Sequence, residues 1–179
     1  MHWLRLPEPR HDIAPAFKDA ASAQAWLGAQ GSAPPLAVFS ALLEQIQAID
    51  GASIPAAQAV ALLNLLRSAA VPLQPALEEQ FTRKALPMTA GETSTFEITH
   101  QLWARLGIAY LRLVPQCTPA KRVLPLQRAA TAFRMAQYCH FLAARTCPQL
   151  LDQLLVAVLA AAELNSILGK PVADPDFPK

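Results

Sequence analysis

The side chains with most chemical potential lie within residues 87–114, PMTAGETSTFEITHQLWARLGIAYLRLV. An imidazole at His100 could bind a ligand or sense pH, because histidine titrates near neutral pH. Large aromatic rings at Trp103 and Tyr110 could stack on a base or nucleotide. Cavities between the helices of a bundle are common ligand sites. His100, Trp103 and Tyr110 are therefore the candidate ligand-binding residues, and the alternative is that all three pack in a core.

A metal centre is the second kind of chemistry to consider. Its candidate ligands are Cys117, Cys139, His140 and Cys147, with His100 as an outlying fifth. Structural zinc sites use closely spaced cysteine pairs, and the spacing C-x21-C-H-x6-C contains none. Free cysteine is also among the most buried residue types. We therefore expect no metal and no cofactor, and the odd number of cysteines fits a reducing compartment.

Catalysis has no recognisable signature in this chain. The acidic residues are mostly single and spread over the predicted helix ends, so no pair of carboxylates can be assigned to acid–base chemistry. The chain contains no G-x-S-x-G turn, no glycine-rich phosphate loop and no H-E-x-x-H pair. The sequence therefore predicts that the protein is not an enzyme.

The elements that must position these residues are predicted to be helices. Hydrophobic residues make up 53% of the chain and charged residues 16%, against about 25% charged in an average soluble protein. Most of the 16 prolines fall between apolar runs, where they mark loops. We predict an all-α bundle of six or seven mostly antiparallel helices with short Pro-rich loops. Residues 1–20 would form an extended N-terminal arm, 21–169 a single helical domain, and 170–179 a linker or frayed tail.

Caps and prolines set the expected helix limits. The first helix should be capped by Ser22, and the fifth should open with a capping box formed by Thr89 and Glu92. Pro125 should either kink or begin the sixth helix. The expected helices span 22–31, 35–49, 55–70, 75–84, 89–114, 119–145 and 148–169.

The fifth of these helices is expected to lie at the centre of the bundle. At about 100° per residue, one broad apolar face carries Phe96, Trp103, Leu106, Tyr110 and Leu113. Glycine follows on the same side at position 107 and would leave room for a close neighbour. Such a wide apolar face requires cover from two sides.

Charge and hydropathy restrict the partners. The net charge of +2 and the scattered basic residues argue against a nucleic acid. The longest apolar run, 154–162, is nine residues long, whereas a membrane span needs about 20. No signal peptide is recognisable at the start. We therefore expect no membrane span and a cytoplasmic location.

Several segments resemble a known protein family. They are 17-FKDAASAQAWL-27, 53-SIPAAQAVALLNLLRSAAVPLQPAL-77, 86-LPMTAGETSTFEITHQLWARLGIAYLRL-113 and 126-LQRAATAFRMAQYCHFLAARTCPQLLDQLLVAVLAAAE-163. Together they resemble the N-terminal helical region of uncharacterised proteobacterial PilZ-associated proteins of cyclic-di-GMP signalling. The arginine pair R-x-x-x-R and the D/N-x-S-x-x-G motif of PilZ nucleotide binding do not occur here. The resemblance thus implies a helical module without the PilZ nucleotide receptor.

Two functions remain open on the sequence alone. The first is a non-catalytic interaction or regulatory module in second-messenger or surface-related signalling. Its partner would be another protein or a second domain of a longer chain, and uncovered apolar faces would also permit a homodimer. The alternative is a receptor that holds a nucleotide, such as cyclic di-GMP, or an apolar ligand between its helices.

Overall fold

A computed structural model of the chain describes residues 6–82 and 88–143. These residues contain helices and no strand, which confirms the all-α class. The α-helices are α1 (Ala20–Ala29), α2 (Pro35–Gly51), α3 (Ala56–Ala70), α4 (Gln74–Phe81), α5 (Ala90–Leu113) and α6 (Val123–Ala143). Three short 3-10 helices connect them: η1 (Val71–Leu73), η2 (Val114–Gln116) and η3 (Pro119–Lys121). The helix expected over 148–169 and the tail 170–179 lie outside the described residues, so the helix count of the whole chain stays a prediction.

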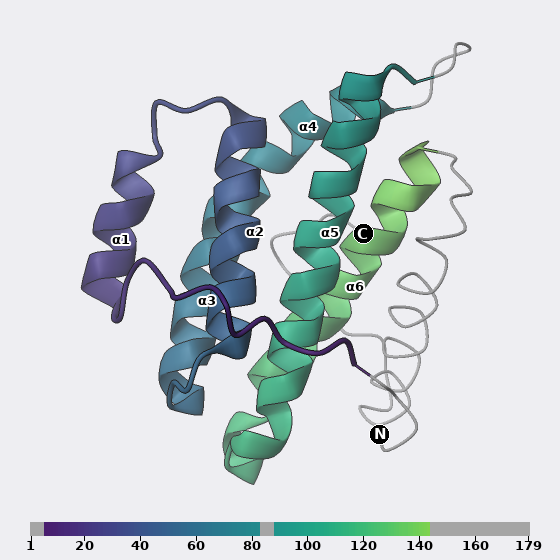
Figure 1. The fold of residues 1–179 in the computed structure, drawn as a ribbon. Helices are drawn as coiled ribbons and strands as arrows, with labels where there is room; N and C mark the ends of the chain where they lie inside the picture. Colours follow the sequence, from purple (N-terminus) through teal and green to yellow (C-terminus); the bar gives the residue numbers. More distant parts are fainter. Residues whose placement is uncertain (1–5, 83–87, 144–179) are drawn as a thin grey trace.

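The helices pack around α5, which runs antiparallel to α3 and α6 and parallel to α2 (Figure 1). In Figure 1, α1, α2 and α3 alternate in direction on one side, α4 crosses at one end, and α5 and α6 complete the body. Helix α5 packs against α2, α3, α4 and α6. Phe96, Trp103, Leu106 and Tyr110 on its apolar face are all fully buried. This confirms the predicted central position of the fifth helix.

The start of α5 follows the predicted chemistry. The Thr89 hydroxyl accepts a hydrogen bond from the Glu92 amide at 3.2 Å, and the Glu92 carboxylate accepts one from the Thr89 amide at 2.7 Å. These two bonds satisfy backbone donors that have no partner inside the helix. The predicted capping box is thus confirmed.

The cap of α1 differs from the prediction, whereas the start of α6 near Pro125 agrees with one of the two predicted alternatives. Asp19, and not Ser22, caps α1: its carboxylate accepts from the Ser22 amide at 2.8 Å, while the Ser22 hydroxyl accepts from the Asp19 amide at 3.2 Å. Ser22 is therefore the third helical residue of a capping box. Helix α6 begins at Val123, so Pro125 lies in its first turn, where a missing N–H costs no helical hydrogen bond and causes no kink.

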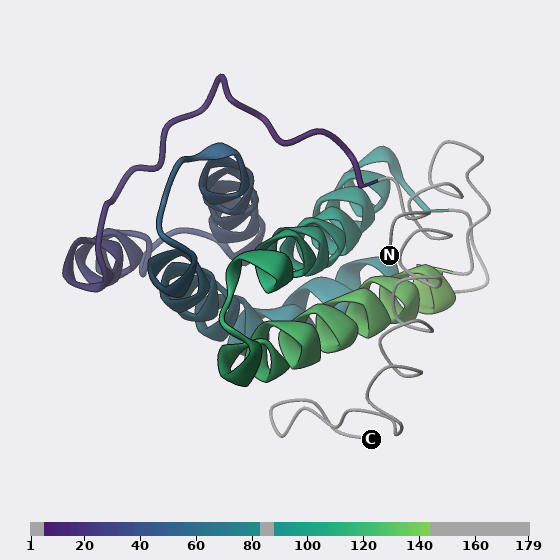
Figure 2. The same cartoon turned by 90° about the horizontal axis from the view of Figure 1, so that it is seen from below.

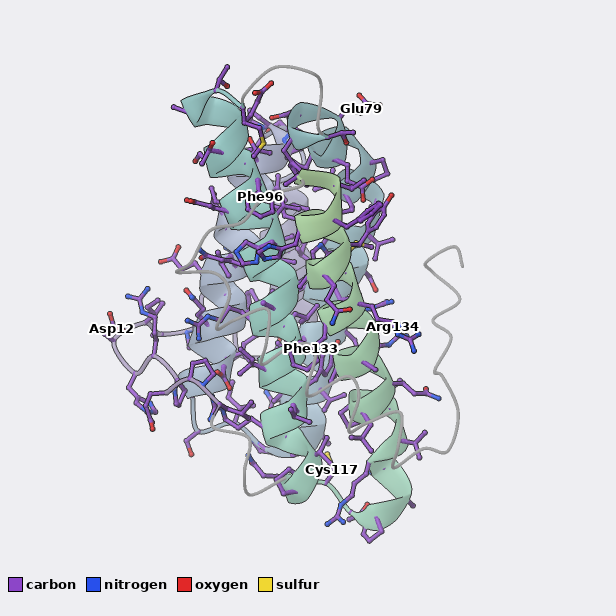
Figure 3. All side chains as sticks on the ribbon, turned by 90° about the vertical axis from the view of Figure 1, so that its right-hand side faces the viewer. Asp12, Glu79, Phe96, Cys117, Phe133 and Arg134 are labelled. Atoms are coloured by element: carbon purple, nitrogen blue, oxygen red, sulfur yellow. The ribbon has the colours of Figure 1, made fainter. Side chains whose placement is uncertain are left out.

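A glycine allows α5 and α6 to approach closely. A Cβ atom on Gly107 would lie 2.6 Å from the Phe133 ring, which real Cβ atoms essentially never do. Phe96, nearer the start of α5, contacts His140 near the end of α6. Phe96 and Phe133 therefore mark two levels of one antiparallel contact (Figure 3). The room predicted beside Gly107 is filled by this phenylalanine.

Residues 6–19 contain neither helix nor strand. They cross the body from the start of α1 to α5, on the side of α5 opposite α6 (Figures 1 and 2). We call residues 6–19 the arm. The division of the whole chain into arm, helical domain and tail remains our proposal.

One helical run in the described part of the chain is long and apolar enough to cross a membrane by length and composition. It spans Ala56–Phe81 and comprises α3, η1 and α4. Its Leu62, Leu63 and Leu66 are buried against the rest of the body. A buried core helix passes the same test, so the run is weak evidence for a membrane span.

Candidate functional site

The first candidate residue, His100, lies between α5 and α6. Its side chain is 1% exposed. The imidazole stacks on Phe96 with 5.2 Å between ring centroids, and it meets the His140 ring edge-on at 4.6 Å. The helical periodicity of apolar residues on α5 places His100 on the buried side. Helix α6 runs antiparallel to α5 and brings His140 to the same level. The two histidines therefore form a buried pair.

Neither histidine of this pair has its Nε2 atom hydrogen-bonded. Burial, together with a smaller effect of the neighbouring His140, lowers the pKa of His100 to about 3. Burial also lowers the pKa of His140. Both rings are consequently neutral at neutral pH. A buried polar atom without a hydrogen-bond partner costs about 1–3 kcal/mol of folding free energy. This pair of histidines therefore destabilises the folded state.

The second candidate, Trp103, points to α4 instead. Its indole Nε1 donates a hydrogen bond of 2.7 Å to Oε1 of Gln74, which is 2% exposed. The Gln74 Nε2 atom donates to Glu78 Oε1 at 3.0 Å and to Cys139 Sγ at 3.5 Å. Burial raises the pKa of the Cys139 thiol to about 12, so the group remains protonated. One glutamine thus joins α4 to both α5 and α6.

The third candidate, Tyr110, points to α3. Its hydroxyl donates a hydrogen bond of 2.5 Å to Asn64 Oδ1. The three candidate residues share one face of α5, as predicted, but they reach three different neighbouring helices. Hollows of about 580 Å³ and about 30 Å³ occur elsewhere in the described structure, and none of the three lines either one. The ligand-binding role of His100, Trp103 and Tyr110 stays a prediction.

Metal ligands were the other chemistry considered. Within residues 6–82 and 88–143, no three histidine, cysteine or acidic side chains are placed to hold a metal ion. His140 lies beside His100, whereas Cys139 contacts Gln74 of α4. Cys117 lies at the turn between α5 and α6, and Cys147 lies outside the described residues. The cysteine and histidine set is therefore not gathered into one centre in this part of the chain.

A polar centre that the sequence did not reveal lies at the end of α2. Asp50, whose side chain is 7% exposed, accepts from Nε of Arg112 at 2.7 Å. Arg112 Nη2 also donates to the Pro7 carbonyl at 2.5 Å. Arg105 lies near this pair, and desolvation lowers its pKa. One sequence signal was available. An acidic side chain in the last turn of a helix is repelled by the negative end of the helix dipole, so a nearby cation is expected.

The structure is thus an all-helical domain. Its histidine pair is buried, and its Asp50–Arg112 ion pair is largely covered by the body. Residues 21–179 match a family model described as the N-terminal domain of the cyclic-di-GMP receptor FimW. The chain belongs to this family, which confirms the resemblance to cyclic-di-GMP-related N-terminal regions and places the chain in second-messenger signalling. No curated protein and no solved structure matches the chain.

Proposed function

We propose that the chain is a non-catalytic interaction and regulatory module that contacts a second domain or a protein partner in cyclic-di-GMP signalling. The family supports the signalling context. One structural observation supports the interaction role: within the described residues, every exposed large hydrophobic side chain lies on α6. These side chains, here called the α6 apolar surface, are Val123 (49% exposed), Leu124 (41%), Tyr138 (44%) and Phe141 (78%).

The α6 apolar surface occupies the two ends of the helix, with Val123 and Leu124 at its start and Tyr138 and Phe141 near its end. Val123 and Phe141 are 18 residues apart, which is five turns at 3.6 residues per turn, so they point in the same direction. Tyr138 lies within about 60° of that direction. Between the two apolar ends, that side carries Gln127, Arg134 and Gln137. Fully burying an exposed apolar side chain stabilises a complex by about 1.5–3 kcal/mol before the costs of association. Phe141, which is 78% exposed, approaches this range, and the other three contribute less. Exposed apolar groups of this kind mark interfaces.

In-cell photo-crosslinking tests this proposal. A photoreactive phenylalanine analogue placed at Phe141 should capture one recurrent protein or second domain, identified by mass spectrometry. The same analogue at Glu79, exposed on α4, is the matched control and should not capture it. Tyr138→Ser should weaken the capture from position 141. Crosslinks from position 141 that do not differ from those at position 79 would count against the interaction role.

A ligand-binding receptor is the second candidate, favoured by the buried imidazoles whose Nε2 atoms have no partner. The ligand would bind at His100, Trp103 and Tyr110. Because these side chains are buried, the neighbouring helices would have to separate to admit it. Thermal shift with cyclic di-GMP and with divalent metals separates the two functions. A ligand at 100 times its dissociation constant stabilises by about 2.7 kcal/mol. A saturable shift that His100→Leu abolishes and His11→Gln keeps would favour the receptor, and no shift would favour the interaction module.

A further inference from the structure

The arm is held to the body by side chains that bind its main chain. Arg112 of α5 donates to the Pro7 carbonyl at 2.5 Å. Gln45 of α2, which is buried, accepts from the Ala16 amide at 2.7 Å. Gln58 of α3 donates to the carbonyl of the residue at position 18. Three helices thus each contribute one polar side chain to an extended segment, and none of these bonds depends on the arm's own side chains.

A glycine shapes the floor beneath the arm. A Cβ atom on Gly51, the last residue of α2, would overlap the carbonyl of Arg10. The His11 ring nitrogen Nδ1 lies 2.9 Å from the Gly51 carbonyl oxygen and donates to it when protonated. Any larger residue at position 51 would push the arm's backbone away. The surface is therefore fitted to a passing main chain.

One aromatic side chain anchors the arm. Phe17 is 5% exposed and packs against Trp26 of α1 at 5.5 Å between ring centroids. Beside it, a hollow of about 580 Å³ lies between residues 15–18 and the loop 52–55. The arm thus combines main-chain hydrogen bonds with one apolar anchor, which is how grooves that bind extended peptides obtain affinity and specificity.

We propose that this arm groove, defined by Gln45, Gly51, Gln58 and Arg112, is a binding site for an extended peptide, and that residues 7–18 occupy it in cis as a displaceable strap. All four groove residues lie inside the matched family region 21–179, whereas the arm precedes it. The ligand class is an extended segment of a partner protein that offers free main-chain groups and an aromatic side chain at the place of Phe17. In Figure 2 the arm runs on the side of α5 opposite α6. The proposed site is thus separate from the α6 apolar surface, and either proposal can fail without the other.

The test uses the full chain and a fluorescent peptide with the sequence of residues 1–20. In the wild type, the covalently attached arm should compete with the peptide, because the attached segment has a high effective concentration. Ala16→Pro removes the amide N–H that donates a hydrogen bond to Gln45, and it leaves the core unchanged. Phe17→Ser removes the aromatic anchor of the arm. Fluorescence anisotropy should show saturable binding at least about 10-fold tighter to either variant than to the wild type.

The matched control keeps the arm variant and damages the groove. Gly51→Ala added to Ala16→Pro should abolish peptide binding, while circular dichroism shows an intact helical body. A peptide that itself carries Ser in place of Phe17 should bind more weakly than the native one. Peptide binding that is no tighter to the arm variants than to the wild type, or that survives Gly51→Ala, would overturn the proposal.

Discussion

Lowering the pH from 8 to 5 perturbs the helical body at the buried imidazole of His100. The pKa of this group is about 3 in the folded chain and 6.5 when unperturbed. The unfolded state therefore binds the proton more readily than the folded state. The stability that comes from keeping the ring neutral is fully present above pH 6.5, and it decreases as the pH falls from 6.5 towards 3.

Linkage gives the size of this effect. At pH 5 the unfolded imidazole is almost fully protonated, whereas the folded one is still neutral. The difference corresponds to a loss of about 2 kcal/mol in the free energy of unfolding relative to pH 8. Such a loss is a large fraction of the 5–15 kcal/mol that typically stabilises a domain.

Urea unfolding at pH 8 and pH 5, followed by circular dichroism, measures this loss. His100→Leu removes the titrating group and keeps an apolar side chain beside Phe96. The wild type should lose about 2 kcal/mol more than this variant between the two pH values. Carboxylates that titrate in the same range affect both proteins equally and cancel in the comparison.

His11→Gln provides the control, because His11 is exposed on the arm. This variant should retain the full pH dependence of the wild type. His100→Leu combined with His140→Leu should reduce the dependence further, since burial lowers the pKa of His140 as well. An equal loss of stability in the wild type and in His100→Leu would refute the assignment of the acid sensitivity to this buried pair.

Three further predictions concern packing and reactivity. Gly107→Ala should destabilise the chain by about 1–3 kcal/mol in urea unfolding, because the new Cβ overpacks against the Phe133 ring; Phe133→Leu should relieve the cost, and additive effects of the two changes would argue against this contact. Gln74→Ala should cost about 1–3 kcal/mol because it leaves the Trp103 indole N–H buried without its acceptor; an unchanged urea midpoint would contradict this. Iodoacetamide at pH 8 should leave Cys139 unmodified in the native chain and modify it in urea, as read by peptide mass spectrometry, since its thiol has a pKa of about 12.

Local signals in the sequence predicted much of the fold. The pair Thr89 and Glu92 identified the start of α5, because a capping box depends only on residues three apart. The same reasoning misplaced the cap of α1, since Asp19 and Ser22 are also three apart and Ser22 is a good cap residue by itself. Local patterns thus indicate that a helix begins nearby more reliably than they identify the capping residue.

The candidate site was harder to predict than the helix that carries it. Periodicity placed His100, Trp103 and Tyr110 on the buried face of α5, but it contains no information about which helix each side chain meets. The contact of Arg112 with Asp50 joins residues 62 apart in the chain. Such a pairing depends on how helices cross in space, so no window of sequence reveals it.

The bond between Arg112 and the Pro7 carbonyl joins residues 105 apart in the chain, which has a consequence for the order of assembly during synthesis. Pro7 is translated early, and its partner follows about 5–20 s later at ordinary rates of synthesis. The glutamine that accepts from Ala16 follows only 29 residues after it. The partner of Ala16 is therefore available before the partner of Pro7, and the bond at Pro7 can form only after most of α5 has been made. If the arm groove binds extended peptides as proposed, this interval is the time at which another extended segment meets the least competition from the arm.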